Sequence, residues 1–160
     1  MTKTPKLVTD AFTLFEKQVA QLPPLTLRGG DAVDSYDLPP VYDPGTDQIT
    51  DEYLNRYACG LNHLDSTSWK HYLPHLIDFA LRTYRALDSP AIYALVQSLR
   101  PPDREPPRLA SLSPLQEKVV VSLLHKLAFD EGSLYQEDAC QALEEYWIEG
   151  ALYRPKGAGA

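Results

Sequence analysis

Between Thr50 and Gly150 the chain repeats one pattern, in which a helix-capping residue precedes apolar residues spaced three and four apart. The segment Ser113-Pro114-Leu115-Gln116 is the clearest case. It combines an N-cap serine, a proline at the first helical position and a capping-box glutamine. The apolar spacing puts hydrophobic side chains on one face of each helix, which has to be buried against other helices. The pattern predicts an all-α fold.

Other helix starts are predicted at Thr50, at the Asp65–Ser68 cluster, at Ser89-Pro90 and at Ser133 with Gln136. We expect Pro74 to begin or kink the helix that ends near Leu87, because proline removes a backbone N–H from the helical ladder. The last helix is expected to close at Gly150, since glycine suits the residue after a helix.

The first part of the chain has weaker helix signals. Thr9 or Asp10 is predicted to cap a first helix that runs to about Gln21. Residues 23–49 are rich in proline and glycine, and they predict a long irregular strap, with a short strand around 40–42 as an option. The strap either packs along the helices or binds a partner.

The composition is that of a globular protein, with 160 residues, 44% hydrophobic and 23% charged. We expect a single helical domain over residues 1–160, an irregular bundle of five to six helices. A flexible lead is expected at 1–8 and a flexible tail at 154–160. Cys59 and Cys140 lie at apolar positions of predicted helices, so we expect buried free thiols in a reducing cytoplasm.

The charge limits the classes of partner. The formal net charge is −7, and the segment from Leu134 to Glu149 holds five acidic residues and no lysine or arginine. Nucleic acid and anionic membrane surfaces attract clustered basic residues, so we expect neither as a partner. No apolar stretch has the length of a membrane span or the character of a secretion signal, which predicts a cytoplasmic protein without membrane insertion.

Three histidines raise the alternative of a small metal-dependent or hydrolytic enzyme. His63, His71 and His75 fall close together, and the last two have the four-residue spacing that zinc ligands use on a helix. The segment lacks the glutamate of His-Glu-x-x-His, and Pro74 separates the two imidazoles. A pair of surface histidines around a kink explains the spacing equally well.

Other catalytic patterns are missing from the sequence. No serine lies in Gly-x-Ser-x-Gly, and Gly29-Gly30 is a bare pair rather than a phosphate-binding loop. Paired carboxylates such as Glu144/Glu145 are adjacent, and adjacent helical residues point about 100° apart. We therefore predict no catalytic residues and no cofactor.

A proline motif lies within the strap. Pro39-Pro40-Val41-Tyr42 matches the Pro-Pro-x-Tyr peptides that bind the aromatic grooves of WW domains as a polyproline II segment. The alternative is a stiff strap packed on the protein's own helices.

Aromatic and acidic residues suggest binding surfaces, because tyrosine and tryptophan suit interfaces and cores alike. For Trp69 and Trp147, burial in the protein's own core is at least as good an explanation as a binding surface. The protein-binding candidates are Tyr36, Pro39, Pro40, Tyr42, Trp69, Tyr72, Glu144, Glu145, Tyr146, Trp147 and Tyr153. The predicted function is a non-enzymatic protein-binding or accessory module, such as an assembly factor, an inhibitor or an immunity-type partner.

Two motifs also resemble a known group of proteins. Trp69 followed by His71-Tyr72-Leu73-Pro74, and Leu112-Ser113-Pro114-Leu115-Gln116 opening a helix, are similar to a family of small bacterial proteins of unknown function, largely from cyanobacteria. The resemblance covers roughly Thr50 to Trp147. It implies an all-helical domain and carries no catalytic residues.

Overall fold

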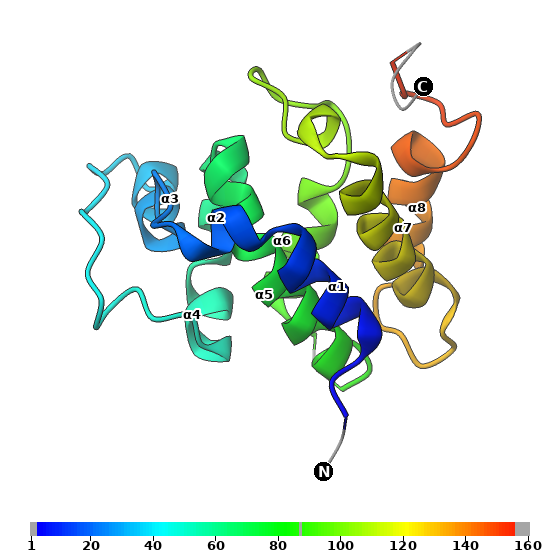
Figure 1. Ribbon diagram of the computed structural model, residues 1–160, viewed down its shortest axis with the longest axis horizontal. Helices are drawn as coiled ribbons and strands as arrows, with labels where there is room; N and C mark the ends of the chain where they lie inside the picture. The colour runs from blue at the N-terminus through cyan, green and yellow to red at the C-terminus, as the bar shows by residue number, and fades with distance from the viewer. Residues whose placement is uncertain (1–2, 87, 156–160) are drawn as a thin grey trace.

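In a computed structural model that describes residues 3–86 and 88–155, all regular structure is helical (Figure 1). The elements are α1 (Lys6–Leu14), α2 (Glu16–Ala20), α3 (Leu27–Asp34), α4 (Asp51–Arg56), the 3-10 helix η1 (Ala58–His63), α5 (Ser66–Thr83), α6 (Pro90–Ser98), the 3-10 turn η2 (Leu109–Ser111), α7 (Pro114–Phe129), α8 (Gln136–Ala142) and the π-helical turn η3 (Leu143–Trp147). The all-α prediction is confirmed for the described residues. The optional strand around 40–42 does not form.

Most of the predicted helix starts are confirmed. Thr50, Asp65, Ser89 and Ser113 each accept a hydrogen bond from a backbone N–H in the first turn of the following helix. Ser113 and Gln116 form the complete capping box. Local side-chain chemistry thus sets where α4, α5, α6 and α7 begin.

Two predicted boundaries in this region are wrong. α5 begins at Ser66 and runs through Pro74, which is buried within it, so of the two predicted options a helix start at Pro74 is wrong. Ser133 does not cap α8, because its hydroxyl accepts from the Tyr135 N–H. The Gln136 side-chain amide donates to the Asp130 carbonyl instead of closing a capping box.

The last helical turn ends at Trp147, before the predicted stop at Gly150. Gly150 has φ of 76°, so it turns the chain beyond the helix, in a conformation that favours glycine. Leu87, the expected end of the Pro74 helix, lies outside the described residues, as do residues 1–2 and 156–160.

The N-terminal prediction also needs correction. α1 begins at Lys6 after Pro5, so residues 6–8 are helical, and neither Thr9 nor Asp10 is the cap. The helix then breaks at Phe15, whose side chain is fully buried, and α2 follows in a new direction. The Phe15 ring is buried in the core at the point where the helix breaks.

Residues 23–49 are not irregular throughout, because α3 forms within them. Thr26 caps α3 by accepting from the Gly29 N–H, and Gly29 and Gly30 are helical. A Cβ on Gly30 would clash with the Gly60 carbonyl oxygen of η1. Glycine at position 30 therefore permits the close approach of α3 to η1.

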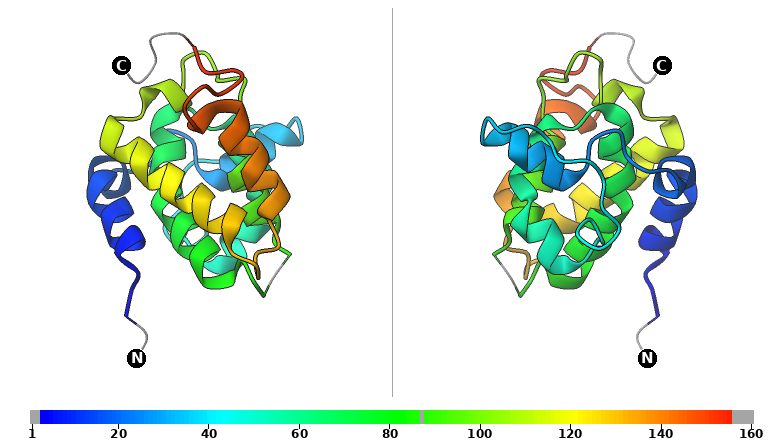
Figure 2. Two further views of the ribbon diagram at one scale, coloured as in Figure 1. Left: turned by 90° about the vertical axis from the view of Figure 1, so that its right-hand side faces the viewer. Right: turned by 90° about the vertical axis from the view of Figure 1, so that its left-hand side faces the viewer.

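The buried apolar side chains form one cluster that joins α1 with α3–α8. α1 packs against α5 and α7, and α7 packs against α8 (Figure 2). Cys59 is exposed and Cys140 is half-buried, so the prediction of two buried thiols is wrong. Within the described residues, no helix combines the length and apolar character needed to cross a membrane.

Candidate functional site

The loop of residues 34–46, hereafter the display loop, is exposed at every position. It includes three large apolar side chains in solvent: Tyr36 is 99% exposed, Leu38 91% and Val41 86%. Figure 1 shows this segment standing away from the helices at one end of the molecule. The side chains of Tyr36 and Leu38 therefore make little contact with the protein's own helices.

A buried ion pair between Arg28 and Asp47 holds the display loop to α3. The Asp47 side chain is fully buried and accepts from Arg28 on α3, with Nε 3.0 Å and Nη2 2.8 Å from its two oxygens. It also accepts from the Tyr53 hydroxyl and the Asp43 N–H, each at 2.8 Å. Arg28 Nη2 reaches on to the Val41 carbonyl at 3.2 Å. The clamp of Arg28, Asp47 and Tyr53 thus holds the backbone of the loop.

The clamp is a charged assembly. Burial raises the pKa of Asp47, but hydrogen bonds from Arg28, Asp43 and Tyr53 outweigh burial, so the pKa of Asp47 lies below its ordinary value. Burial likewise raises the pKa of the Tyr53 hydroxyl, which remains a donor. The carboxylate is therefore ionised at neutral pH and paired with the Arg28 guanidinium.

The loop starts from an unusual helix end. Tyr36 has φ of 63°, in the left-handed region that non-glycine residues rarely adopt. Its N–H donates to the Val33 carbonyl and the Asp37 N–H donates to the Ala32 carbonyl, which is the Schellman arrangement that usually holds glycine. At the other end, the Asp43 carboxylate accepts from the N–H groups of Gly45 and Thr46.

An apolar groove continues from the display loop onto the chain before α3. Its volume is about 320 Å³. The lining residues are Leu22, Pro23, Pro24, Leu25, Thr26, Pro39, Pro40, Val41 and Tyr42. Tyr42 is 37% exposed, less than Tyr36, Leu38 or Val41.

Four of the predicted interface aromatics lie in the core. Trp69, Tyr72, Tyr146 and Trp147 are buried. Trp69 donates its indole N–H to the Ser98 hydroxyl, and Trp147 donates its indole N–H to the Leu99 carbonyl. Both indole N–H groups therefore make hydrogen bonds within the protein. The core alternative therefore describes both tryptophans.

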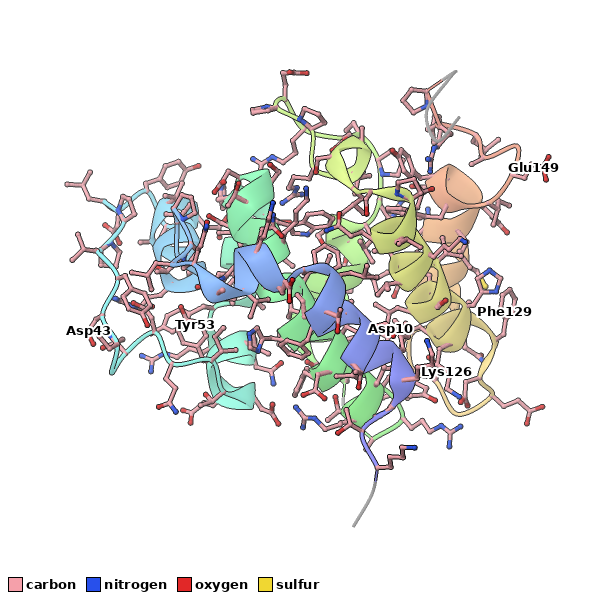
Figure 3. The ribbon with its side chains drawn as sticks, in the orientation of Figure 1. Asp10, Asp43, Tyr53, Lys126, Phe129 and Glu149 are labelled. Atoms are coloured by element: carbon pink, nitrogen blue, oxygen red, sulfur yellow. The ribbon has the colours of Figure 1, made fainter. Side chains whose placement is uncertain are left out.

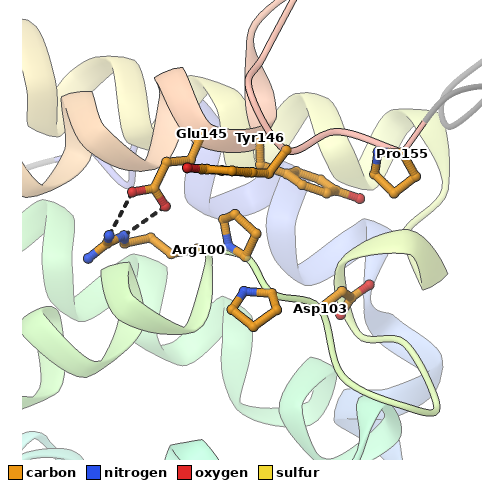
Figure 4. A pocket seen from close by; sticks show the side chains of 8 residues that line it. Arg100, Asp103, Glu145, Tyr146 and Pro155 are labelled. Atoms are coloured by element: carbon orange, nitrogen blue, oxygen red, sulfur yellow. Dashed lines mark hydrogen bonds and ion pairs between the residues drawn. The ribbon is translucent and has the colours of Figure 1, made fainter.

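The candidates outside the display loop and the core are Glu144, Glu145 and Tyr153. Glu145, Tyr146 and Tyr153 border a cleft of about 540 Å³, and Glu144 is exposed on the same turn, η3 (Figure 4). Figure 3 shows the separation, with Asp43 of the display loop at one edge and Glu149 at the other. The structure thus sorts the predicted residues into a loop, a cleft and the core.

The three histidines are engaged separately. His63 donates to the Asp34 carboxylate at 2.8 Å, and His71 Nδ1 donates to the Gln18 carbonyl at 2.7 Å. The His75 ring packs against Phe12, and burial, with His71 nearby, lowers its pKa to about 4. Within residues 3–86 and 88–155, no three His, Cys, Asp or Glu side chains are placed to hold a metal ion.

The clamp residues Arg28, Asp47 and Tyr53 were not predicted from the sequence. They come together only because α3, the display loop and α4 meet in space. No local spacing joins an arginine to an aspartate 19 positions later, so the sequence offers no signal for this pair.

Comparison with known proteins identifies the family. A model for a family of unknown function, DUF6714, matches residues 5–151, so the chain belongs to that family. No match was found among curated proteins or among solved structures. The matched region includes the display loop and its clamp, which the two sequence motifs did not cover.

Proposed function

We propose that this member of the family is a non-enzymatic protein-binding or accessory module, and that the display loop is its docking surface. One observation supports this most strongly: Leu38 and Val41 are held in solvent by a loop whose backbone is clamped. Single exposed apolar residues are ordinary, whereas a contiguous and fixed set is typical of interaction sites. A fixed loop also loses little entropy when a partner binds.

The backbone at Tyr36 supports the same proposal. A non-glycine residue in the left-handed region costs about 1 kcal/mol or more relative to glycine. The Tyr36 side chain recovers none of this cost inside the protein, because it is 99% exposed. The end of α3 needs a left-handed residue at this position but not a tyrosine, and non-glycine residues in this conformation are a feature of functional sites.

The chemistry of the loop indicates how a partner would recognise it. Residues 38–42 make no backbone–backbone hydrogen bond to any described residue, and they include Pro39-Pro40. Such an extended proline segment suits an aromatic-lined groove. The exposed carboxylates of Asp37 and Asp43 favour a groove with a basic rim.

The proposal includes a cytoplasmic location and a role such as an assembly factor, an inhibitor or an immunity-type partner. A bacterial, largely cyanobacterial, distribution of the family remains part of it. The rival, an enzyme using His63, His71 and His75, has no support from their separate hydrogen-bond and packing partners.

Affinity capture with loop variants tests the proposal. The tagged wild-type chain, Leu38→Ser/Val41→Ser and the control Phe129→Ser are each used to capture proteins from extract of the native host. Phe129 is 66% exposed on α7, away from the loop, so it matches the change in surface character. We expect a protein enriched by the wild type and the control and reduced at least tenfold by the double variant. Equal capture by all three, or capture of nothing above background, would reject the proposal.

A further inference from the structure

The helices α7 and α8 lie side by side on one surface of the molecule. The left view of Figure 2 shows both of them on the side that faces the viewer, with α8 starting close to the end of α7. The two helices pack against each other and, because the connection between them is short, run in opposite directions. Their exposed side chains therefore form two antiparallel stripes on a single face.

The α7 stripe is basic in its middle and apolar at its two ends. At about 100° per residue, the exposed residues after Pro114 fall within a sector roughly 100° wide. They are Leu115, Lys118, Ser122, His125, Lys126 and Phe129. Leu115 is 57% exposed and Phe129 66%, and the stripe holds no carboxylate. It is a local basic patch on a chain whose formal net charge is −7.

The stripe along α8 and η3 has the opposite charge and is also apolar at both ends. Its exposed residues are Leu134, Glu137, Gln141, Glu144 and Ile148. Among the described residues, Lys118, Glu137 and Glu144 have no ion-pair partner. Lys126 reaches Asp130 of its own helix end at 3.6 Å. The two stripes thus carry opposite charges that do not pair with each other within the described part of one chain.

Placed face to face in opposite directions, the two stripes match position by position. The facing pairs are Leu115 with Ile148, Lys118 with Glu144, Ser122 with Gln141, Lys126 with Glu137 and Phe129 with Leu134. The register is constant to within one residue along the whole stripe. The apolar ends supply burial, and the opposite charges between them fix the register.

From this match we propose that the face of α7 and α8 binds a second copy of the chain. The two copies are related by a two-fold axis that runs between the two helices and along them. α7 of each copy lies on α8 and η3 of the other, so every facing pair occurs twice, as a two-fold interface requires. The two helix pairs stack as a four-helix bundle. The lysines and glutamates balance within the interface, and salt screens the remaining net charge over about 8 Å.

The size of the face indicates a weak dimer. α7 has 16 residues, so it is about 24 Å long, and two packed helices are roughly 20 Å wide. Each copy buries about 500 Å², or about 1,000 Å² for the pair, which is near the lower limit for a specific interface. We expect a reversible dimer with a Kd roughly in the micromolar range.

The display loop lies on the opposite side of the molecule from α7 and α8 (Figure 1). The dimer therefore leaves both loops exposed, and each loop binds a soluble partner with the affinity that it has in the monomer. The dimer stands or falls independently of the proposed docking function.

Sedimentation equilibrium with charge-reversed variants tests the dimer. One variant is Lys118→Glu/Lys126→Glu, and the other is Glu137→Lys/Glu144→Lys. At about 100 µM, well above such a Kd, we expect the wild type to approach twice the chain mass of 18.0 kDa. Association should weaken at about 1 M salt, where the screening length falls to about 3 Å. Each variant alone places like charges face to face, so its association should weaken at least about tenfold.

An equimolar mixture of the two variants is the decisive arm. Their heterodimer pairs opposite charges on both stripes, so the mixture should regain the mass of the wild-type dimer. Both variants keep a net negative charge, so overall attraction does not explain such a recovery. Lys17→Glu/Arg56→Glu, at exposed positions on α2 and α4, is the matched control and should associate like the wild type. The proposal is overturned if the wild type is monomeric at about 1 mM, far above the expected Kd. It is also overturned if reversal on either stripe leaves the dimer intact, or if the mixture stays monomeric.

Discussion

Tyr36 occupies the position after α3 where a helix end normally has glycine. Replacement by glycine removes the steric cost of the left-handed conformation, and no internal contact of the side chain is lost. We predict that Tyr36→Gly raises the free energy of unfolding by about 0.5–1 kcal/mol, measured by urea denaturation. The same change should weaken partner binding. A variant that is destabilised would show that the tyrosine side chain supports the fold instead.

Asp47 is the residue on which the clamp depends. Asp47→Asn removes the charge that pairs with Arg28 while keeping a similar shape, and loss of one partner of a buried pair typically costs about 3 kcal/mol. We predict this loss in urea denaturation at pH 7, together with faster amide exchange at Asp43, whose N–H donates to Asp47. Asp37→Asn, at an exposed position, is the control and should change stability by under about 0.5 kcal/mol. Equal stability of the two variants would contradict the role of the clamp.

We predict that the protein loses stability in mild acid because His75 is buried. Burial, and then the neighbouring His71, lower its pKa from 6.5 to about 4 in the folded chain. The unfolded chain therefore takes up the proton first as the pH falls. The stability that the neutral His75 contributes to the fold is complete above pH ~6.5 and is lost progressively towards pH ~4. The full loss is up to about 3 kcal/mol. Carboxylates with lowered pKa, such as Asp47, add losses only below the ordinary carboxyl range, about pH 4.

Urea midpoints between pH 7.5 and 4.5 measure this effect. His75→Leu should flatten the pH dependence in this window, and His125→Gln, at an exposed position on α7, should not. If the wild type and His75→Leu lose stability equally, His75 is not the group that titrates.

At the scale of elements, the contact between α3 and η1 is made by backbone rather than side chains. A Cβ on Gly60 would clash with the Leu27 carbonyl oxygen and lie 2.5 Å from the Asp31 nitrogen. We predict that Gly60→Ala lowers the free energy of unfolding by about 2–3 kcal/mol, since backbone atoms cannot rotate away. Gly45→Ala, in the exposed loop, meets only the Asp43 side chain and should cost far less. Similar denaturation midpoints for the two variants would contradict this close approach.

The elements also show what the sequence could predict. α7 was predicted at its start because Ser113 and Gln116 carry a local capping signal. α3 is not predicted because Gly29 and Gly30 have low helix propensity, and the close contact that requires glycine at position 30 is with Gly60, thirty residues later. The same limit applies to the candidate site. Tyr36, Pro39 and Tyr42 were named from their chemistry, whereas the Arg28–Asp47 clamp depends on tertiary contacts.

For the whole molecule, the core separates two surfaces of different character. The display loop presents exposed apolar side chains at one end, and the cleft bordered by Arg100, Glu145 and Tyr153 lies elsewhere on the surface. A partner bound at the loop therefore leaves the cleft open. Variants that change stability, such as Gly60→Ala, and the loop variant Leu38→Ser/Val41→Ser should have additive effects on the free energy of unfolding, because distant sites usually contribute additively.

The dissociation constant of the captured partner, measured by calorimetry, tests the central claim most directly. We predict that Leu38→Ser/Val41→Ser raises it at least tenfold while the urea midpoint stays within error, because both side chains contact solvent rather than the core. Phe129→Ser and Tyr146→Phe should leave it unchanged. An unchanged constant for the loop variant, or a loss that Phe129→Ser shares, would contradict the claim that the display loop is the docking surface.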